Sequence, residues 1–93
     1  MRKDFFILNP AAGKHDRTAE LAARISRVAT AHGLDYRIIM TEYKGHAIQI
    51  VDRESRENAP AVCRFYACGG DGTLNEVVCG AAGHENAQDR KSV

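Results

Sequence analysis

The chain has 93 residues, with 13 basic and 12 acidic side chains and a formal net charge of +1. This length allows one small domain, and the near-zero charge gives no basis for general attraction to nucleic acid or to a membrane surface. No apolar run approaches the ~20 residues of a transmembrane helix, and the N-terminus lacks the long apolar segment of a signal peptide. We therefore expect a cytoplasmic protein without a transmembrane segment and without nucleic-acid partners.

The apolar residues predict strands and helices in alternation. Strands are expected at 5–8, 36–40 and 61–68. The first helix is expected to begin after Asp16 and to end at Gly33. Its apolar stripe consists of Leu21, Ile25, Val28, Ala29 and His32.

Two further helices follow the second and third strands. One is expected to end before Pro60, since the residue ahead of a proline disfavours helical geometry; its buried face consists of Ala47, Ile50, Val51 and Glu54. The other is expected to have a capping box formed by Thr73 and Glu76 and to end at Gly83. Its apolar stripe consists of Leu74, Val77, Val78 and Ala81.

The order of elements is therefore βαβαβα, which predicts an α/β fold: a three-layer unit with a parallel sheet and right-handed crossovers. The last ten residues, HENAQDRKSV, are polar and have no period, so residues 84–93 are interpreted as a polar C-terminal tail. Because three strands leave a sheet edge unsatisfied, we expect the chain to form a homo-oligomer.

The three cysteines are expected to be reduced and to act as small hydrophobic residues. Cys63 and Cys68 lie an odd number of residues apart on one strand, so their side chains should point to opposite faces. Their spacing matches no common zinc site.

The three predicted strands end in loops with suggestive sequences, NPAAGK at 9–14, TEYKGHA at 41–47 and GGDGT at 69–73. Parallel strands bring their carboxyl ends to one edge of the sheet, where ligands bind. Glycine amides before a helix form a cradle for phosphate, and Asp71 is the one acid among these glycines. The Walker A motif is excluded, and the dinucleotide fingerprint fails because Asn75 stands where its third glycine would be. The loops therefore predict phosphoryl chemistry on a nucleotide.

The string GGDGTLNEVVCG resembles the nucleotide-binding signature of the diacylglycerol kinase catalytic family, which includes bacterial diacylglycerol and other lipid kinases, sphingosine kinases and ceramide kinases. FILNPAAGK is similar to that family's N-P-x-[AS]-G-[KR] loop, and TEYKGHA to its T-x-x-x-G-[HD]-A segment. The resemblance runs from Phe5 to about Gly83. It implies the N-terminal nucleotide-binding domain of the NAD kinase/diacylglycerol kinase fold, in truncated form.

The resemblance also implies cofactors and residue roles. ATP and Mg²⁺ would be bound, and the phosphates would be held by Gly69, Gly70, Gly72 and Thr73. The nucleotide pocket would be lined or flanked by Asn9, Gly13, Lys14, Thr41 and His46. Asp71 would be the active-site acid, near either the magnesium ion or the acceptor hydroxyl, and no residue is assigned as a metal ligand. Lys14 could equally be a solvated loop lysine, and Glu76 either completes the capping box or supports Asp71.

Members of this family continue after the third helix with another strand, a G-T-x-N-D-[FL] loop and a large β-sandwich domain. We expect residues 1–83 to be the first part of the catalytic domain and the β-sandwich to be absent. The resemblance implies the ATP-binding part of a lipid kinase of phospholipid biosynthesis, which transfers the γ-phosphate to a lipid hydroxyl of a diacylglycerol-like substrate and is inactive as this chain. Two alternatives remain: a non-catalytic nucleotide- or partner-binding module, and a relative of NAD kinase.

Overall fold

A computed structural model describes residues 1–10 and 18–91. Four strands and three helices alternate along these residues: β1 (Arg2–Leu8), α1 (Thr18–Ala31), β2 (Tyr36–Met40), α2 (His46–Asn58), β3 (Val62–Cys68), α3 (Asp71–Ala81) and β4 (Ala87–Lys91). The strands form one parallel sheet in the order β2-β1-β3-β4. The predicted α/β fold is confirmed, with a fourth strand added to it.

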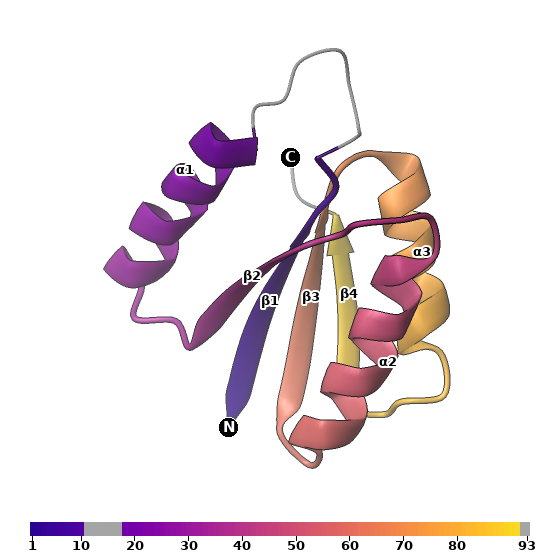
Figure 1. Cartoon of the computed structure of the whole chain (residues 1–93). Coiled ribbons are helices and arrows are strands. Elements are labelled where there is room, and N and C mark those ends of the chain that lie inside the picture. The colour runs from indigo at the N-terminus through magenta and orange to yellow at the C-terminus, as the bar shows by residue number, and fades with distance from the viewer. Residues whose placement is uncertain (11–17, 92–93) are drawn as a thin grey trace.

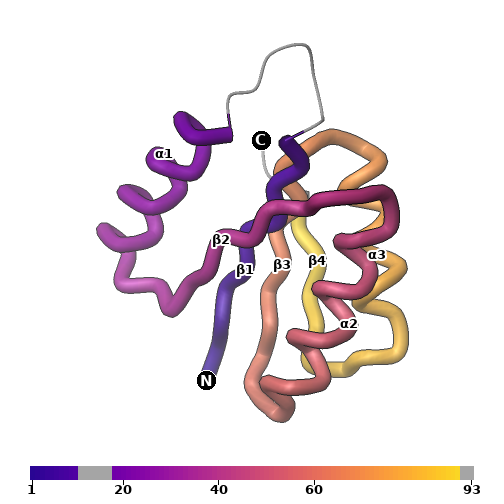
Figure 2. The backbone as a smooth tube through the Cα atoms, viewed as in Figure 1, coloured from indigo at the N-terminus to yellow at the C-terminus, as the bar shows by residue number. Residues whose placement is uncertain are grey.

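The sheet lies between two helical layers (Figure 1). Alternate residues of β1 point to opposite faces, as the pleat requires. Phe5 and Ile7 join the core beneath α2 and α3, whereas Phe6 and Leu8 pack with residues of α1. The tube in Figure 2 shows α1 on one side of the strands and the α2–α3 pair on the other. The three-layer arrangement expected from the alternation of elements is therefore present.

The larger core lies between the sheet and the α2–α3 pair. The rings of Phe5 and Phe65 stack at a centroid distance of 4.9 Å, and Val51 and Val77 are fully buried above them. The two helices approach closely at Gly80, where an added Cβ would lie 2.7 Å from the carbonyl oxygen of Ile48. This tight packing holds the start of α2 beside α3.

The smaller core lies under α1. Ile25 and Ala29 are buried there, as predicted. Val28 and His32, which were expected in the same stripe, are exposed, because α1 turns the side of Leu21 and Ala22 toward the sheet instead. The helix ends as predicted: Gly33 has φ +65°, and Leu34 N–H donates to the carbonyl oxygen of Ala29 at 3.0 Å.

The interpretation of residues 84–93 as a tail is wrong for β4. This strand pairs in parallel with β3, with Ala87 beside Cys63. Asn86 aligns it, since its side-chain amide donates to the carbonyl oxygens of Ser55 and Ala61, both at 2.9 Å. The pairing rests on backbone hydrogen bonds, which a polar sequence can make as well as an apolar one. The strand that family members have after the third helix is therefore present, and the sheet has β2 and β4 at its edges.

The cysteines lie as the strand geometry predicted. Cys63 is buried on the α2–α3 face and Cys68 on the α1 face, and no disulfide bond joins the cysteines, all of which lie in the described residues. Burial raises the pKa of the Cys63 thiol, and the nearby Glu54 carboxylate adds to this rise. Cys63 is therefore a small core residue rather than a reactive thiol.

Candidate functional site

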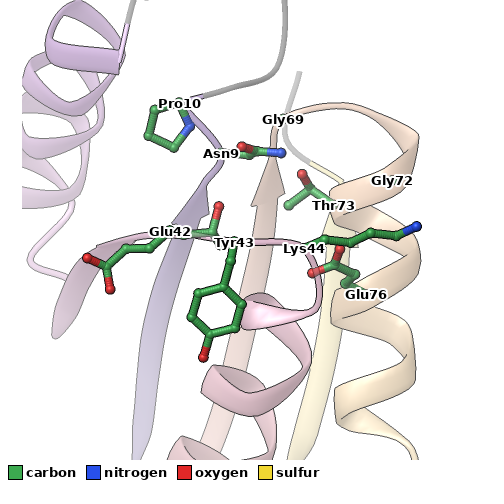
Figure 3. Close-up of a pocket in the computed structure, with 10 residues that line it drawn as sticks. Asn9, Pro10, Glu42, Tyr43, Lys44, Gly69, Gly72, Thr73 and Glu76 are labelled. Atoms are coloured by element: carbon green, nitrogen blue, oxygen red, sulfur yellow. The ribbon is translucent and has the colours of Figure 1, made fainter.

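The carboxyl ends of β1, β2 and β3 meet at a cleft with a volume of about 530 Å³ (Figure 3). The residues that follow the three strands supply its walls. They are Asn9 and Pro10 after β1, Thr41, Glu42, Tyr43 and Lys44 after β2, and Gly69, Gly72, Thr73 and Glu76 from the turn after β3 and from α3. The convergence that the parallel topology predicted is therefore observed.

The turn after β3 requires glycine for two different reasons. A Cβ on Gly69 would lie 2.7 Å from Thr73 Oγ1 and 2.9 Å from Asn9 Cβ, closer than atoms of that kind approach. Gly70 has φ +98°, a region that residues with a Cβ rarely adopt. These glycines bring the backbone of the turn against Asn9, whose own N–H donates to the carbonyl oxygen of Cys68 at 3.5 Å.

The N-terminus of α3 forms the floor of the cleft. The helix begins at Asp71, and its first hydrogen bond runs from Leu74 N–H to Gly70 O at 3.1 Å. Amides in a first helical turn have no acceptor within the helix, and Gly72 and Thr73 of this turn line the cleft. A Cβ on Gly72 would meet nothing within 4 Å. This arrangement suits a bound anion, because the helix dipole and the amides both favour negative charge.

The predicted capping box is absent. Thr73 is the third residue of α3 rather than its N-cap, and no side chain caps this helix. Glu76 instead reaches across to the neighbouring helix, where its Oε1 accepts the backbone N–H of Ala47 at 3.3 Å. Glu76 therefore lies in the wall of the cleft and caps α2, a contact between helices that no spacing within one helix could reveal.

The opposite wall is the loop between β2 and α2. Thr41 joins it to β1, because its backbone N–H and its hydroxyl both donate to Leu8 O, at 2.8 and 3.3 Å. His46 closes the loop by accepting Glu42 N–H at Nδ1 at 2.9 Å. Gly45, with φ +90°, allows the reversal of direction before α2. The TEYKGHA segment is thus a fixed turn, and His46 holds its shape.

Five of the predicted site residues line the cleft together: Asn9, Thr41, Gly69, Gly72 and Thr73. Gly70 and Asp71 lie in the same turn, are exposed, and are not among the lining residues. Gly13 and Lys14 lie outside the described residues. Sequence reasoning missed four lining residues, Pro10, Glu42, Tyr43 and Lys44, although they belong to loops that it singled out. These four residues directly follow the ends of predicted strands, and that position could have predicted that they line the cleft.

The charges at the cleft are mixed. Lys44 contributes a cation, and Figure 3 shows its side chain extending toward the α3 side of the opening. Glu42 and Glu76 contribute carboxylates. Among residues 1–10 and 18–91, no three His, Cys, Asp or Glu side chains come together in a way that could hold a metal ion.

Comparison with known proteins identifies the family of this chain. Residues 3–91 match the family described as the diacylglycerol kinase catalytic domain. A putative lipid kinase of Bacillus subtilis, YtlR, is 34% identical over 76 residues, which cover 82% of this chain and 24% of that protein. The mitochondrial acylglycerol kinase of Homo sapiens is 34% identical over 80 residues, covering 86% of this chain and 18% of that protein. The chain belongs to the diacylglycerol kinase catalytic domain family.

The described residues contain no helix that is both long enough and apolar enough to cross a membrane. The chain spans about a quarter or less of the length of the curated relatives that it matches.

Proposed function

We propose that this chain is the ATP-binding part of a lipid kinase, and that the enzyme transfers the γ-phosphate of ATP to the hydroxyl of a diacylglycerol-like lipid. The observation that supports this best is the cleft itself, in which the glycine turn and the N-terminus of α3 face the ends of β1 and β2. Phosphoryl transfer depends mostly on positioning and on neutralising charge. Backbone amides and a helix dipole supply both.

The residues of the turn would hold the triphosphate. Gly69 and Gly72 would let phosphate oxygens approach the backbone, and Thr73 would add its amide and its hydroxyl. Gly70 would fix the turn through its positive φ. Asn9 and Thr41 would line the nucleotide on the β1 and β2 sides. Gly13 and Lys14 are also proposed as phosphate-loop residues. They lie outside the described part of the chain.

Asp71 is proposed as the active-site acid, acting either on the magnesium ion or on the acceptor hydroxyl. The proposal is supported by its position as the first residue of α3, next in sequence to Gly72, which lines the cleft. Mg²⁺, when bound with ATP, would neutralise the phosphate oxygens, and Asp71 and Glu76 are the carboxylates of the α3 side that could reach it. Lys44 would attract the same anionic phosphates from the opposite loop.

We further propose that the 93-residue chain alone does not phosphorylate lipid at an enzymatic rate. The described residues line a cleft beside the strand ends, but no three His, Cys, Asp or Glu side chains among them come together in a way that could hold a metal ion. The alternative is a non-catalytic module that binds nucleotide or a partner. A relative of NAD kinase is less favoured, because the family match covers residues 3–91 and includes the NPAAGK and TEYKGHA loops.

Calorimetric titration with magnesium and ATP tests the proposal. Saturable binding is expected, together with no measurable transfer of radiolabelled phosphate to diacylglycerol vesicles. Phosphate transfer to diacylglycerol at a normal enzymatic rate, if abolished by Asp71→Asn, would overturn the proposed inactivity. The proposal that the chain binds ATP would still hold. An absence of ATP binding at millimolar concentration would instead favour the non-catalytic module.

Two further expectations stay proposals. A homo-oligomer could form through β4, which is one of the two outer strands of the described sheet, and sedimentation velocity at high concentration would show a single monomeric species if this is wrong. A cytoplasmic location likewise rests on the sequence alone.

A further inference from the structure

The loop after β2 carries an aromatic side chain that is fixed in place at the cleft. The Tyr43 ring stacks on the His46 ring at a centroid distance of 4.4 Å and an interplanar angle of 14°. Its hydroxyl donates to Gln49 Oε1 at 2.7 Å. Both contacts are made with the first residues of α2, so the ring is held at its face and at its tip.

Despite these contacts, Tyr43 is 53% exposed and lines the cleft. The parallel stack with His46 occupies one face of the ring, and among the described residues no other ring stacks on Tyr43. Figure 3 shows the ring directed away from Gly69 and Thr73, beside the start of α2. A tyrosine has an apolar ring and a polar tip, which suits a site that is apolar on one side and open to water on the other.

We propose that the free face of Tyr43 is the stacking surface for the purine base of the nucleotide, and that His46 and Gln49 are its positioning residues. This inference rests on the proposed function. Bases stack readily on aromatic side chains, and a ring whose orientation is already fixed loses little freedom when the base binds. With the triphosphate at the glycine turn, the base would lie at the other end of the same cleft.

The test compares ATP with inorganic tripolyphosphate, which has the phosphates and no base. Tyr43→Ala should weaken ATP binding by about fivefold or more, the effect of one lost base–aromatic stack. Tripolyphosphate binding should change by less than about twofold. Tyr43→Phe is the matched control: it keeps the ring and loses only the hydrogen bond to Gln49, so ATP affinity should stay within about threefold of the unmodified chain.

Four other results would contradict the proposed stacking of the base on Tyr43. Equal ATP affinity in Tyr43→Ala and the unmodified chain would show that the ring does not contact the base. An equal loss of ATP and tripolyphosphate binding would show that Tyr43 only shapes the loop. If the unmodified chain binds tripolyphosphate as tightly as ATP, no base site exists, although the phosphate site stands. If it binds neither, the proposed function fails and the inference fails with it.

Discussion

The Glu76 carboxylate of α3 accepts the backbone N–H of Ala47 in the first turn of α2. One side chain therefore joins α3, which follows the glycine turn, to α2, which follows the loop after β2. Since Glu76 also lines the cleft, the two walls of the candidate site are held together by a residue of the site itself. A carboxylate is well suited to this role, because the N-terminus of a helix attracts negative charge.

Replacing Glu76 should therefore lower the stability of the fold. Glu76→Ala removes the acceptor for Ala47 N–H and should lower the free energy of unfolding by ~1 kcal/mol, as the loss of a helix cap does. Glu76→Gln keeps a side-chain oxygen and should cost about half as much. Urea denaturation followed by circular dichroism measures both. Equal stability of the alanine variant and the unmodified chain would show that the contact contributes nothing.

Two glycines of α3 should respond to alanine in opposite ways. Gly80→Ala would place a Cβ 2.7 Å from Ile48 O and 2.8 Å from Val51 Cβ, so α2 and α3 would have to move apart. The expected cost is ~1–3 kcal/mol. Gly72→Ala meets no atom within 4 Å, and alanine favours a helix, so stability should be unchanged or raised by up to ~1 kcal/mol. A similar loss in both variants would contradict the observed helix packing.

Gly72→Ala should nevertheless weaken ATP binding. The added methyl group would occupy space at the cleft that a phosphate needs in order to approach the amides of the first turn of α3. We expect the affinity for ATP to fall by about tenfold, equivalent to ~1.4 kcal/mol. Asn75→Ala, on an exposed position of the same helix, is the matched control and should change the affinity by less than about twofold. Calorimetry distinguishes the two variants, and equal affinities would place the phosphates elsewhere.

A hydrogen bond far from the cleft makes stability depend on pH. His84 Nε2 lies 2.7 Å from Asp52 Oδ1, and this contact, helped by Arg56, holds the pKa of the Asp52 carboxyl below its ordinary value. A carboxyl with a lowered folded-state pKa stabilises the fold above its unfolded pKa, and that contribution is lost as the pH falls through the folded pKa. Asp52→Asn should therefore be less stable than the unmodified chain at neutral pH.

The difference between Asp52→Asn and the unmodified chain should shrink below pH ~4, the ordinary range of a carboxyl. Urea midpoints measured from pH 3 to pH 7 test this, with Glu57→Gln as a control on an exposed position of the same helix. A difference that stays constant across this range would mean that the ionisation of Asp52 does not contribute.

The sequence predicted the parts of this fold that depend on local patterns. The apolar run at 5–8 and the glycines at 33 and 83 placed the elements well, and the topology alone brought Asn9, Thr41 and Gly69 to one edge. Strand β4 was missed because AQDRK has no apolar period, and an outer strand is defined by its backbone pairing. The contact of Glu76 could not be predicted from local patterns either. Its partner, Ala47, lies on another helix and not at a fixed spacing along α3.

We propose that the glycine turn and the loops facing it bind the phosphates of ATP. Amide NMR of the labelled chain, titrated with magnesium and ATP, tests this binding site residue by residue. We expect saturable shifts at Asn9, at residues 41–44 and at residues 69–73, with α1 unaffected. An absence of shifts at millimolar ATP, or shifts centred on α1 and the outer edge of β4, would contradict it.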